Sequence, residues 1–153
     1  NQGFDAVINV QGDEPFIDEN YIDKIAQLLI DGAEIATLSH TIKDESEIDN
    51  PNKVKVAFTE SKKALYFSRS RIPFNRNSNF NNYFGHIGIY GYSSKVLAKI
   101  TQLEPSTLEL AESLEQLRWL ENDFSIHVDV VENPSIGVDT PEDLEKLLKS
   151  LNN

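Results

Sequence analysis

Short apolar runs alternate with amphipathic segments along this chain, and this alternation restricts its fold more than any other feature. Residues 6–10 form a β-branched apolar run that is typical of a strand buried in an α/β sheet. From Asp18 onward, apolar residues recur at helical spacing, and Gly32 is placed to end that helix. Interleaved strands and helices indicate an α/β architecture.

The remaining elements follow from the same periodicities. The pattern predicts further strands over residues 34–41, 84–92 and 125–131, a β-hairpin from 54–58 and 64–68, a long loop over 69–83, and helices over 94–103, 106–121 and 140–151. No internal repeat or linker interrupts the sequence. We therefore expect residues 1–153 to form a single three-layer α/β domain with a mixed, mostly parallel sheet.

Charge and composition exclude several classes of function. The chain has 25 acidic and 14 basic residues, a formal net charge of −11, so it should repel nucleic acids and anionic lipid surfaces. A phosphorylated partner would need a cation to mediate the contact. The absence of cysteine excludes disulfides, thiolate metal sites and cysteine nucleophiles. No apolar run approaches the ~20 residues of a membrane span. We expect a soluble, cytoplasmic protein with neither nucleic acid nor membrane as a partner.

The sequence contains no methionine and leads almost at once into an apolar strand. We therefore expect the chain to be part of a longer polypeptide.

Two acidic motifs follow predicted strands. Gly12, Asp13 and Glu14 lie in a turn directly after the strand at 6–10, and Asp139 precedes the predicted N-cap Thr140. Ligands of open α/β sheets bind at the carboxyl ends of strands. Each motif taken alone also fits a polar turn or a helix start. If the two strands are neighbours, however, Asp13 and Asp139 form an oxygen-ligand site suited to Mg²⁺ and substrate phosphates.

The segment 84–92 alternates with a period of two. Ile87 and Ile89 point to one face, and His86, Gly88 and Tyr90 point to the other. We interpret the second face as the floor of a polar ligand site, with a gap over Gly88 between two side chains about 13 Å apart along the strand. A solvent-facing sheet surface with aromatic cross-strand pairs is the alternative.

The predicted helix at 106–121 has a leucine stripe at Leu110, Leu114 and Leu117. A second face carries Glu112, Glu115, Gln116 and Trp119, and such faces are usually solvated. Arg69 begins the long loop, where its guanidinium could bind a carboxylate through two hydrogen bonds. The sequence has no glycine-rich phosphate loop and no defensible nucleophile.

Five blocks, taken together, resemble the 3-deoxy-manno-octulosonate (Kdo) cytidylyltransferase family, also called CMP-Kdo synthetases. They comprise residues 9–15, 64–69, 86–92, 114–118 and 137–144, in family order. The resemblance implies a nucleotidyltransferase-like fold and transfer of a cytidylyl group from CTP to Kdo, with release of pyrophosphate. It also implies a role in lipopolysaccharide or capsule biosynthesis, Mg²⁺ as cofactor and a homodimer.

The resemblance further implies residue roles. Asp13 and Asp139 would be the catalytic metal ligands. The substrate-binding positions would be Gln11, Arg69, His86, Tyr90, Glu115 and Gln116. The N-terminal nucleotide-binding portion of the family has no counterpart here, so we expect the chain alone to be inactive. A non-catalytic sugar- or metal-binding module and a sialic-acid type of nucleotidyltransferase remain as alternatives.

Overall fold

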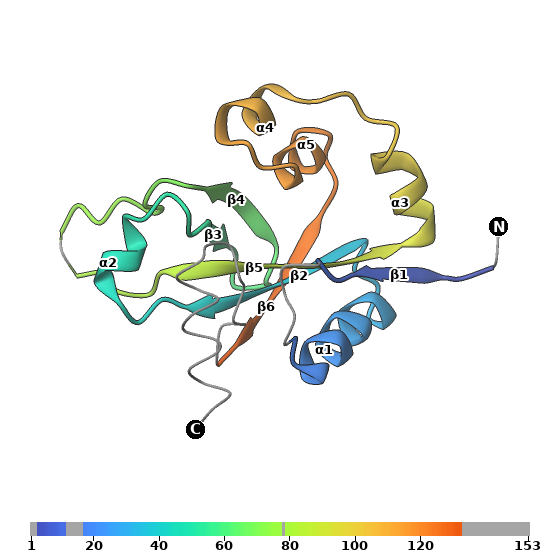
Figure 1. The fold of residues 1–153 in the computed structure, drawn as a ribbon, viewed down its shortest axis with the longest axis horizontal. Coiled ribbons are helices and arrows are strands. Elements are labelled where there is room, and N and C mark those ends of the chain that lie inside the picture. The colour runs from blue at the N-terminus through green and yellow to red at the C-terminus, as the bar shows by residue number, and fades with distance from the viewer. Residues whose placement is uncertain (1–2, 12–16, 78, 133–153) are drawn as a thin grey trace.

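The structure is a computed structural model and describes residues 3–11, 17–77 and 79–132 (Figure 1). Its elements in chain order are β1 (Ala6–Asn9), α1 (Glu19–Ile30), β2 (Ile35–Thr41), α2 (Glu45–Ile48), β3 (Lys55–Phe58), β4 (Ala64–Ser68), β5 (Phe84–Ser93), α3 (Ser94–Ile100), α4 (Thr107–Glu112), α5 (Gln116–Glu121) and β6 (Ile126–Val131).

One sheet organises these elements, and its longest strand, β5, lies at the centre. The strand order is β4-β3-β5-β2-β6, and β1 pairs with the C-terminal half of β5. A mixed sheet was predicted and is confirmed. The expectation that it is mostly parallel is wrong for the described strands, because β5 runs antiparallel to β1, β2 and β3, and β3 is antiparallel to β4. Among these strands, β2 and β6 alone pair in parallel.

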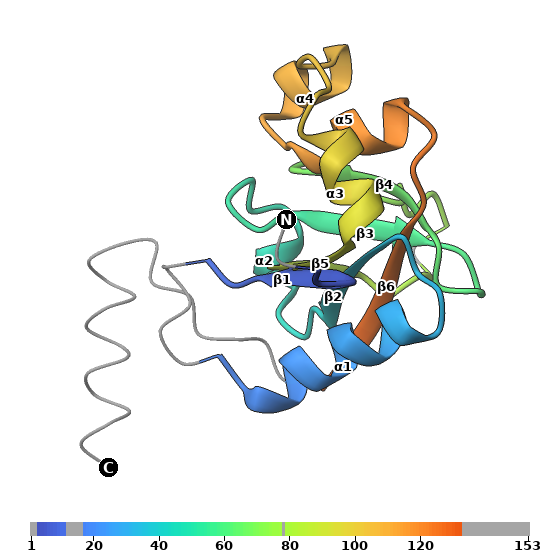
Figure 2. The ribbon, with the colours of Figure 1, turned by 90° about the vertical axis from the view of Figure 1, so that its right-hand side faces the viewer.

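Helices cover both faces of the sheet, so the predicted three layers are present (Figure 2). On one face α1 packs through Tyr21 and Ile25 against Ile87 and Ile89 of β5. On the other face, α3 and α5 cover a larger apolar cluster that includes Trp119. Both faces of β5 are therefore buried along much of their length.

Capping residues mark the ends of two of the described helices, α1 and α2. Asp18 caps α1 by accepting a hydrogen bond from the backbone N–H of Asn20, and Gly32 follows the helix with a positive φ of 99°. The short helix α2 was not predicted, although Asp44 caps it in the same way through Ser46.

The predicted helix at 106–121 is corrected, because it is two helices. Ser113 adopts a left-handed conformation with φ 54° and ends α4, and α5 begins at Gln116. The break changes the expected leucine stripe, because Leu114 and Leu117 are buried whereas Leu110 is 70% exposed.

Residues 69–83 contain no helix or strand among the positions described, as the sequence predicted. The predicted helix at 140–151 lies outside the described residues. None of the described helices is long and apolar enough to cross a membrane.

Candidate functional site

The centre of β5 carries a bulge that shapes the candidate site. Thr37 lies opposite Tyr90 and its neighbour Leu38 lies opposite Ile87, so two β5 residues, Gly88 and Ile89, have no counterpart on β2. The buried hydroxyl of Thr37 fills this irregularity. Its Oγ1 is 2.8 Å from the carbonyl oxygen of Ile89 and 3.2 Å from that of Ile87. The Thr37 hydroxyl thus lies within hydrogen-bond distance of two backbone carbonyls of the bulged segment, and the shorter contact is to Ile89.

His86 is held by the same hydroxyl. Its Nε2 lies 3.0 Å from Thr37 Oγ1. Because the single Thr37 proton is directed to a carbonyl, we assign the proton of this contact to Nε2, which leaves Nδ1 as an acceptor. Burial of the ring lowers the pKa of His86 to about 3, so the imidazole is neutral at physiological pH.

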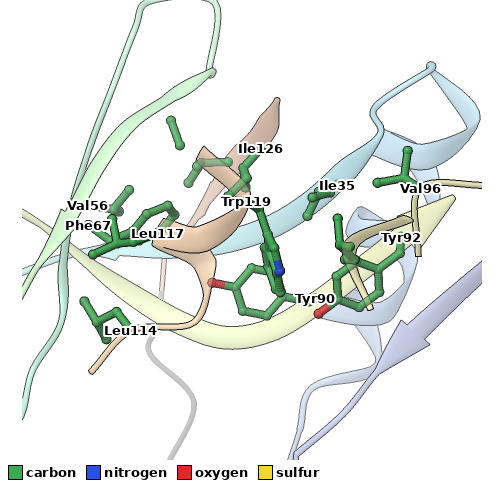
Figure 3. Packing of buried hydrophobic residues seen from close by; sticks show 13 residues of the cluster. Ile35, Val56, Phe67, Tyr90, Tyr92, Val96, Leu114, Leu117, Trp119 and Ile126 are labelled. Atoms are coloured by element: carbon green, nitrogen blue, oxygen red, sulfur yellow. The ribbon is translucent and has the colours of Figure 1, made fainter. Parts of the chain in front are cut away.

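Tyr90 belongs to a row of aromatic rings on the same face. Its ring centroid is 5.3 Å from that of His86, 6.0 Å from that of Tyr92 and 5.1 Å from that of Trp119, which Figure 3 shows in part. The Tyr90 hydroxyl is buried, and the Tyr90 side chain interacts with that of Thr37. Burial raises the pKa of Tyr90 well above the ordinary value, so the hydroxyl stays protonated and can donate.

The predicted alternation of β5 is confirmed, but the predicted gap is corrected. His86 and Tyr90 share a face as expected, yet the bulge brings their rings together, and they do not flank an empty space. The position over Gly88 is instead beside the Gln11 side chain. A Cβ on Gly88 would lie 3.3 Å from Gln11 Oε1. The β1–β5 register, which pairs Asn9 with Tyr90, places Gln11 opposite Gly88 when it is continued by two residues.

A pocket of about 310 Å³ opens beside this row, between β1, the end of β5, α3 and α5. Its wall is mostly apolar and includes Tyr92 and Trp119, and Glu115 supplies its carboxylate. Glu115 is exposed, and its Oε1 lies 3.4 Å from Nη2 of Arg118. The same nitrogen lies closer to Oε1 of Glu109, at 2.6 Å. The next residue, Gln116, is buried at the first position of α5.

Arg69 lies beyond the end of β4 and is already bonded to the backbone. Its Nε donates to the carbonyl oxygen of Glu112 at 2.8 Å, its Nη1 to that of Pro51 at 3.0 Å, and its Nη2 to that of Ser113 at 3.4 Å. A guanidinium has five N–H donors, so two remain for a ligand.

The structure therefore brings Gln11, His86 and Tyr90 together, links them to α5 through Trp119, and places Arg69 at the far end of α4. The predicted metal ligands, Asp13 and Asp139, lie outside the described residues. Within the described part of the chain, no three His, Asp or Glu side chains form a group that could hold a metal ion.

Comparison with known proteins decides the family. A model of the family described as cytidylyltransferase matches residues 1–129. The chain belongs to this cytidylyltransferase family. Two relatives are named 3-deoxy-manno-octulosonate cytidylyltransferase. The one from Cytophaga hutchinsonii is 50% identical, and the match covers 94% of this chain and 60% of the relative. The one from Parabacteroides distasonis is 46% identical, and the match covers 99% of this chain and 65% of the relative.

The fold of this cytidylyltransferase chain also matches a solved structure. A CMP:2-keto-3-deoxy-manno-octonic acid synthetase in complex with CTP superposes with a TM-score of 0.90 and is 41% identical, over 97% of this chain and 63% of that protein. The resemblance to CMP-Kdo synthetases is thus confirmed. This cytidylyltransferase chain spans about 60% of the length of the curated relatives it matches.

Sequence reasoning missed two residues in and around the candidate site. Thr37 lies in β2, which was predicted only as a strand, and nothing in the sequence shows that its hydroxyl meets a bulge on β5. Glu112 was expected to be solvated. Its carboxylate instead accepts hydrogen bonds from Ser68 Oγ at 2.6 Å and from the backbone N–H of Arg69 at 2.9 Å.

Proposed function

We propose that this chain forms the sugar-binding part of a 3-deoxy-manno-octulosonate cytidylyltransferase, acting within a full-length protein of its relatives' size. In the reaction, the anomeric hydroxyl oxygen of Kdo bonds to the α-phosphorus of CTP and loses its proton to solvent. The bond between that phosphorus and the oxygen bridging to the β-phosphate breaks, and pyrophosphate leaves. CMP-Kdo is the product.

The observation that carries this proposal is the group of polar side chains on one face of β5, in a chain whose relatives bear this name. A sugar presents many hydroxyls, so its site needs neutral donors and acceptors. The Nδ1 atom of His86 can accept, the Tyr90 hydroxyl can donate, and the Gln11 amide can do both. Glu115 and Gln116 supply further groups from the start of α5.

The carboxylate of Kdo needs a cation. We propose that Arg69 provides it through the two guanidinium N–H groups that are not bonded to backbone carbonyls.

The triphosphate of CTP requires charge neutralisation beside a chain with a formal charge of −11. The carboxylates of Asp13 and Asp139 are hard oxygen donors that suit Mg²⁺, and we propose that they hold it. When bound, the metal neutralises charge on the phosphates and lowers the pKa of the attacking hydroxyl. From the family resemblance, we also propose a cytoplasmic homodimer that supplies CMP-Kdo for lipopolysaccharide or capsule assembly.

Pyrophosphate release by the full-length protein tests this function. We expect turnover with CTP and Kdo in the presence of magnesium, little turnover with sialic acid, and none from residues 1–153 alone. Preference for sialic acid would assign the related nucleotidyltransferase. Binding of Kdo without any turnover would assign a non-catalytic sugar-binding module.

A further inference from the structure

Glu112 and Arg69 bind each other in both directions. The Glu112 side chain accepts from the backbone N–H of Arg69, and the Arg69 side chain donates to the backbone carbonyl of Glu112. Ser68 adds a third link, because its buried hydroxyl donates to the other oxygen of Glu112. We call these three residues the 68–112 brace. It joins the end of β4 to the end of α4.

Lys55 also binds the backbone of Arg69. This lysine is fully buried, and its Nζ donates to the backbone carbonyls of Asn50, Lys53 and Arg69. Burial lowers its pKa. The backbone N–H, the backbone C=O and the guanidinium of Arg69 are therefore all bonded, so Arg69 has little freedom to move.

The segment that leaves the brace leads straight to the candidate sugar site. Ser113, whose carbonyl accepts from Arg69, takes the left-handed conformation that ends α4. Leu114 then enters the core, and Glu115 and Gln116 follow at once. The position of these two residues relative to β5 depends on where α4 ends, and the brace fixes that point.

We propose that Glu112 is a positioning residue of the sugar site, which it serves by holding the end of α4 on β4 so that Glu115 and Gln116 face the β5 surface. This inference rests on the proposed function. A carboxylate suits the role because it accepts from two donors at once. Removing it leaves the buried Ser68 hydroxyl and the Arg69 N–H without their acceptor.

The test compares two variants of the full-length protein. Glu112→Ala should raise the KM for Kdo about tenfold, because small displacements of positioning groups are costly, while the KM for CTP stays unchanged. Glu112→Gln should restore most of the affinity for Kdo. Its amide oxygen can accept from the Arg69 N–H, and its amide nitrogen can donate to Ser68 Oγ.

A control separates positioning from general loss of stability. Thr59 accepts a hydrogen bond from the backbone N–H of Lys63 at 3.1 Å, at the turn between β3 and β4 and away from the brace. Thr59→Ala should lower the melting temperature without changing the KM for Kdo. A Glu112→Ala variant with an unchanged KM for Kdo, or with equal increases for Kdo and CTP, would overturn the inference.

A second readout does not depend on the reaction. The amides of Leu117 and Arg118 bond to the carbonyls of Leu114 and Glu115. In the full-length protein, Glu112→Ala should speed hydrogen exchange of these two amides, and Glu112→Gln should not. Unchanged exchange in Glu112→Ala would overturn the inference about the brace, whether or not the wild-type protein is active with Kdo. Faster exchange in Glu112→Ala together with an inactive wild-type protein would count against the proposed function alone.

Discussion

The Oγ1 atom of Thr37 lies 3.0 Å from Nε2 of His86 and 2.8 Å from the carbonyl oxygen of Ile89, so one buried hydroxyl holds both the imidazole and the β5 bulge. The bulge places the His86 and Tyr90 rings 5.3 Å apart on one face. The local geometry of the candidate sugar site thus depends on a residue of the neighbouring strand.

Thr37→Val tests this dependence, because valine keeps the shape of threonine and removes the hydroxyl. The Ile89 carbonyl and His86 Nε2 would lose their partner in a fully buried setting. We expect a loss of about 1–3 kcal/mol in the free energy of unfolding. Urea denaturation of residues 1–153 measures it. Thr37→Ser, which keeps the hydroxyl, should lose clearly less, and equal losses would show that the hydroxyl is not what matters.

The neutral state of His86 predicts a pH dependence of stability. Its folded pKa of about 3 lies below the ordinary value of about 6.5, so between these values the unfolded state binds more protons. Stability should therefore fall as pH is lowered through this range, by up to about 2 kcal/mol from pH 7 to pH 5.

The matched variant for this measurement is His86→Gln. It should lose less stability than the wild type between pH 7 and pH 5. Burial also lowers the pKa of His40, but that residue is present in both proteins and cancels in the difference. Equal losses in the two proteins would mean that His86 titrates normally in the folded state.

Asp13→Asn and Asp139→Asn address the proposed metal ligands in the full-length protein. Each change removes one negative charge from the proposed Mg²⁺ site, so turnover should fall much more than stability does. Pyrophosphate release across a magnesium titration measures the effect, and thermal denaturation provides the control. Near-normal rates for both variants at modest magnesium would contradict the assignment.

Hydrophobic periodicity predicted most of the fold because strands and helices here bury one face or both. The hairpin of β3 and β4, the strand β5 and the helix α1 all appear where apolar spacing placed them. The break at Ser113 was missed, since the spacing of Leu110, Leu114 and Leu117 continues through it. A left-handed serine has no clear sequence signal, because it is stabilised by contacts made after folding.

The candidate site was predictable in part for the same reason. A period of two correctly placed His86, Gly88 and Tyr90 on one face, but the bulge that brings the rings together depends on pairing with Thr37. Arg69 shows the same limit. Its residue type suggested a carboxylate ligand, whereas its bonds to the backbone carbonyls of Pro51, Glu112 and Ser113 depend on where the fold places these residues.

Gly88 and Gly91 offer the most direct comparison, because they lie on opposite faces of β5. A side chain at Gly88 would meet the end of the exposed Gln11 side chain, which can move, whereas one at Gly91 would overlap Ile25 and Leu29 of α1. Gly91→Ala should therefore destabilise the protein by about 1–3 kcal/mol through overpacking and leave Kdo binding by the folded protein intact.

The measurement that tests the central claim is the affinity of the full-length Gly88→Val variant for Kdo, taken together with its melting temperature. We predict a near-normal melting temperature, since valine favours strands, and a loss of Kdo binding, since the added methyl groups occupy the surface between Gln11, His86 and Tyr90. A Gly88→Val protein that binds Kdo as tightly as the wild type would show that this face of β5 is not the sugar site.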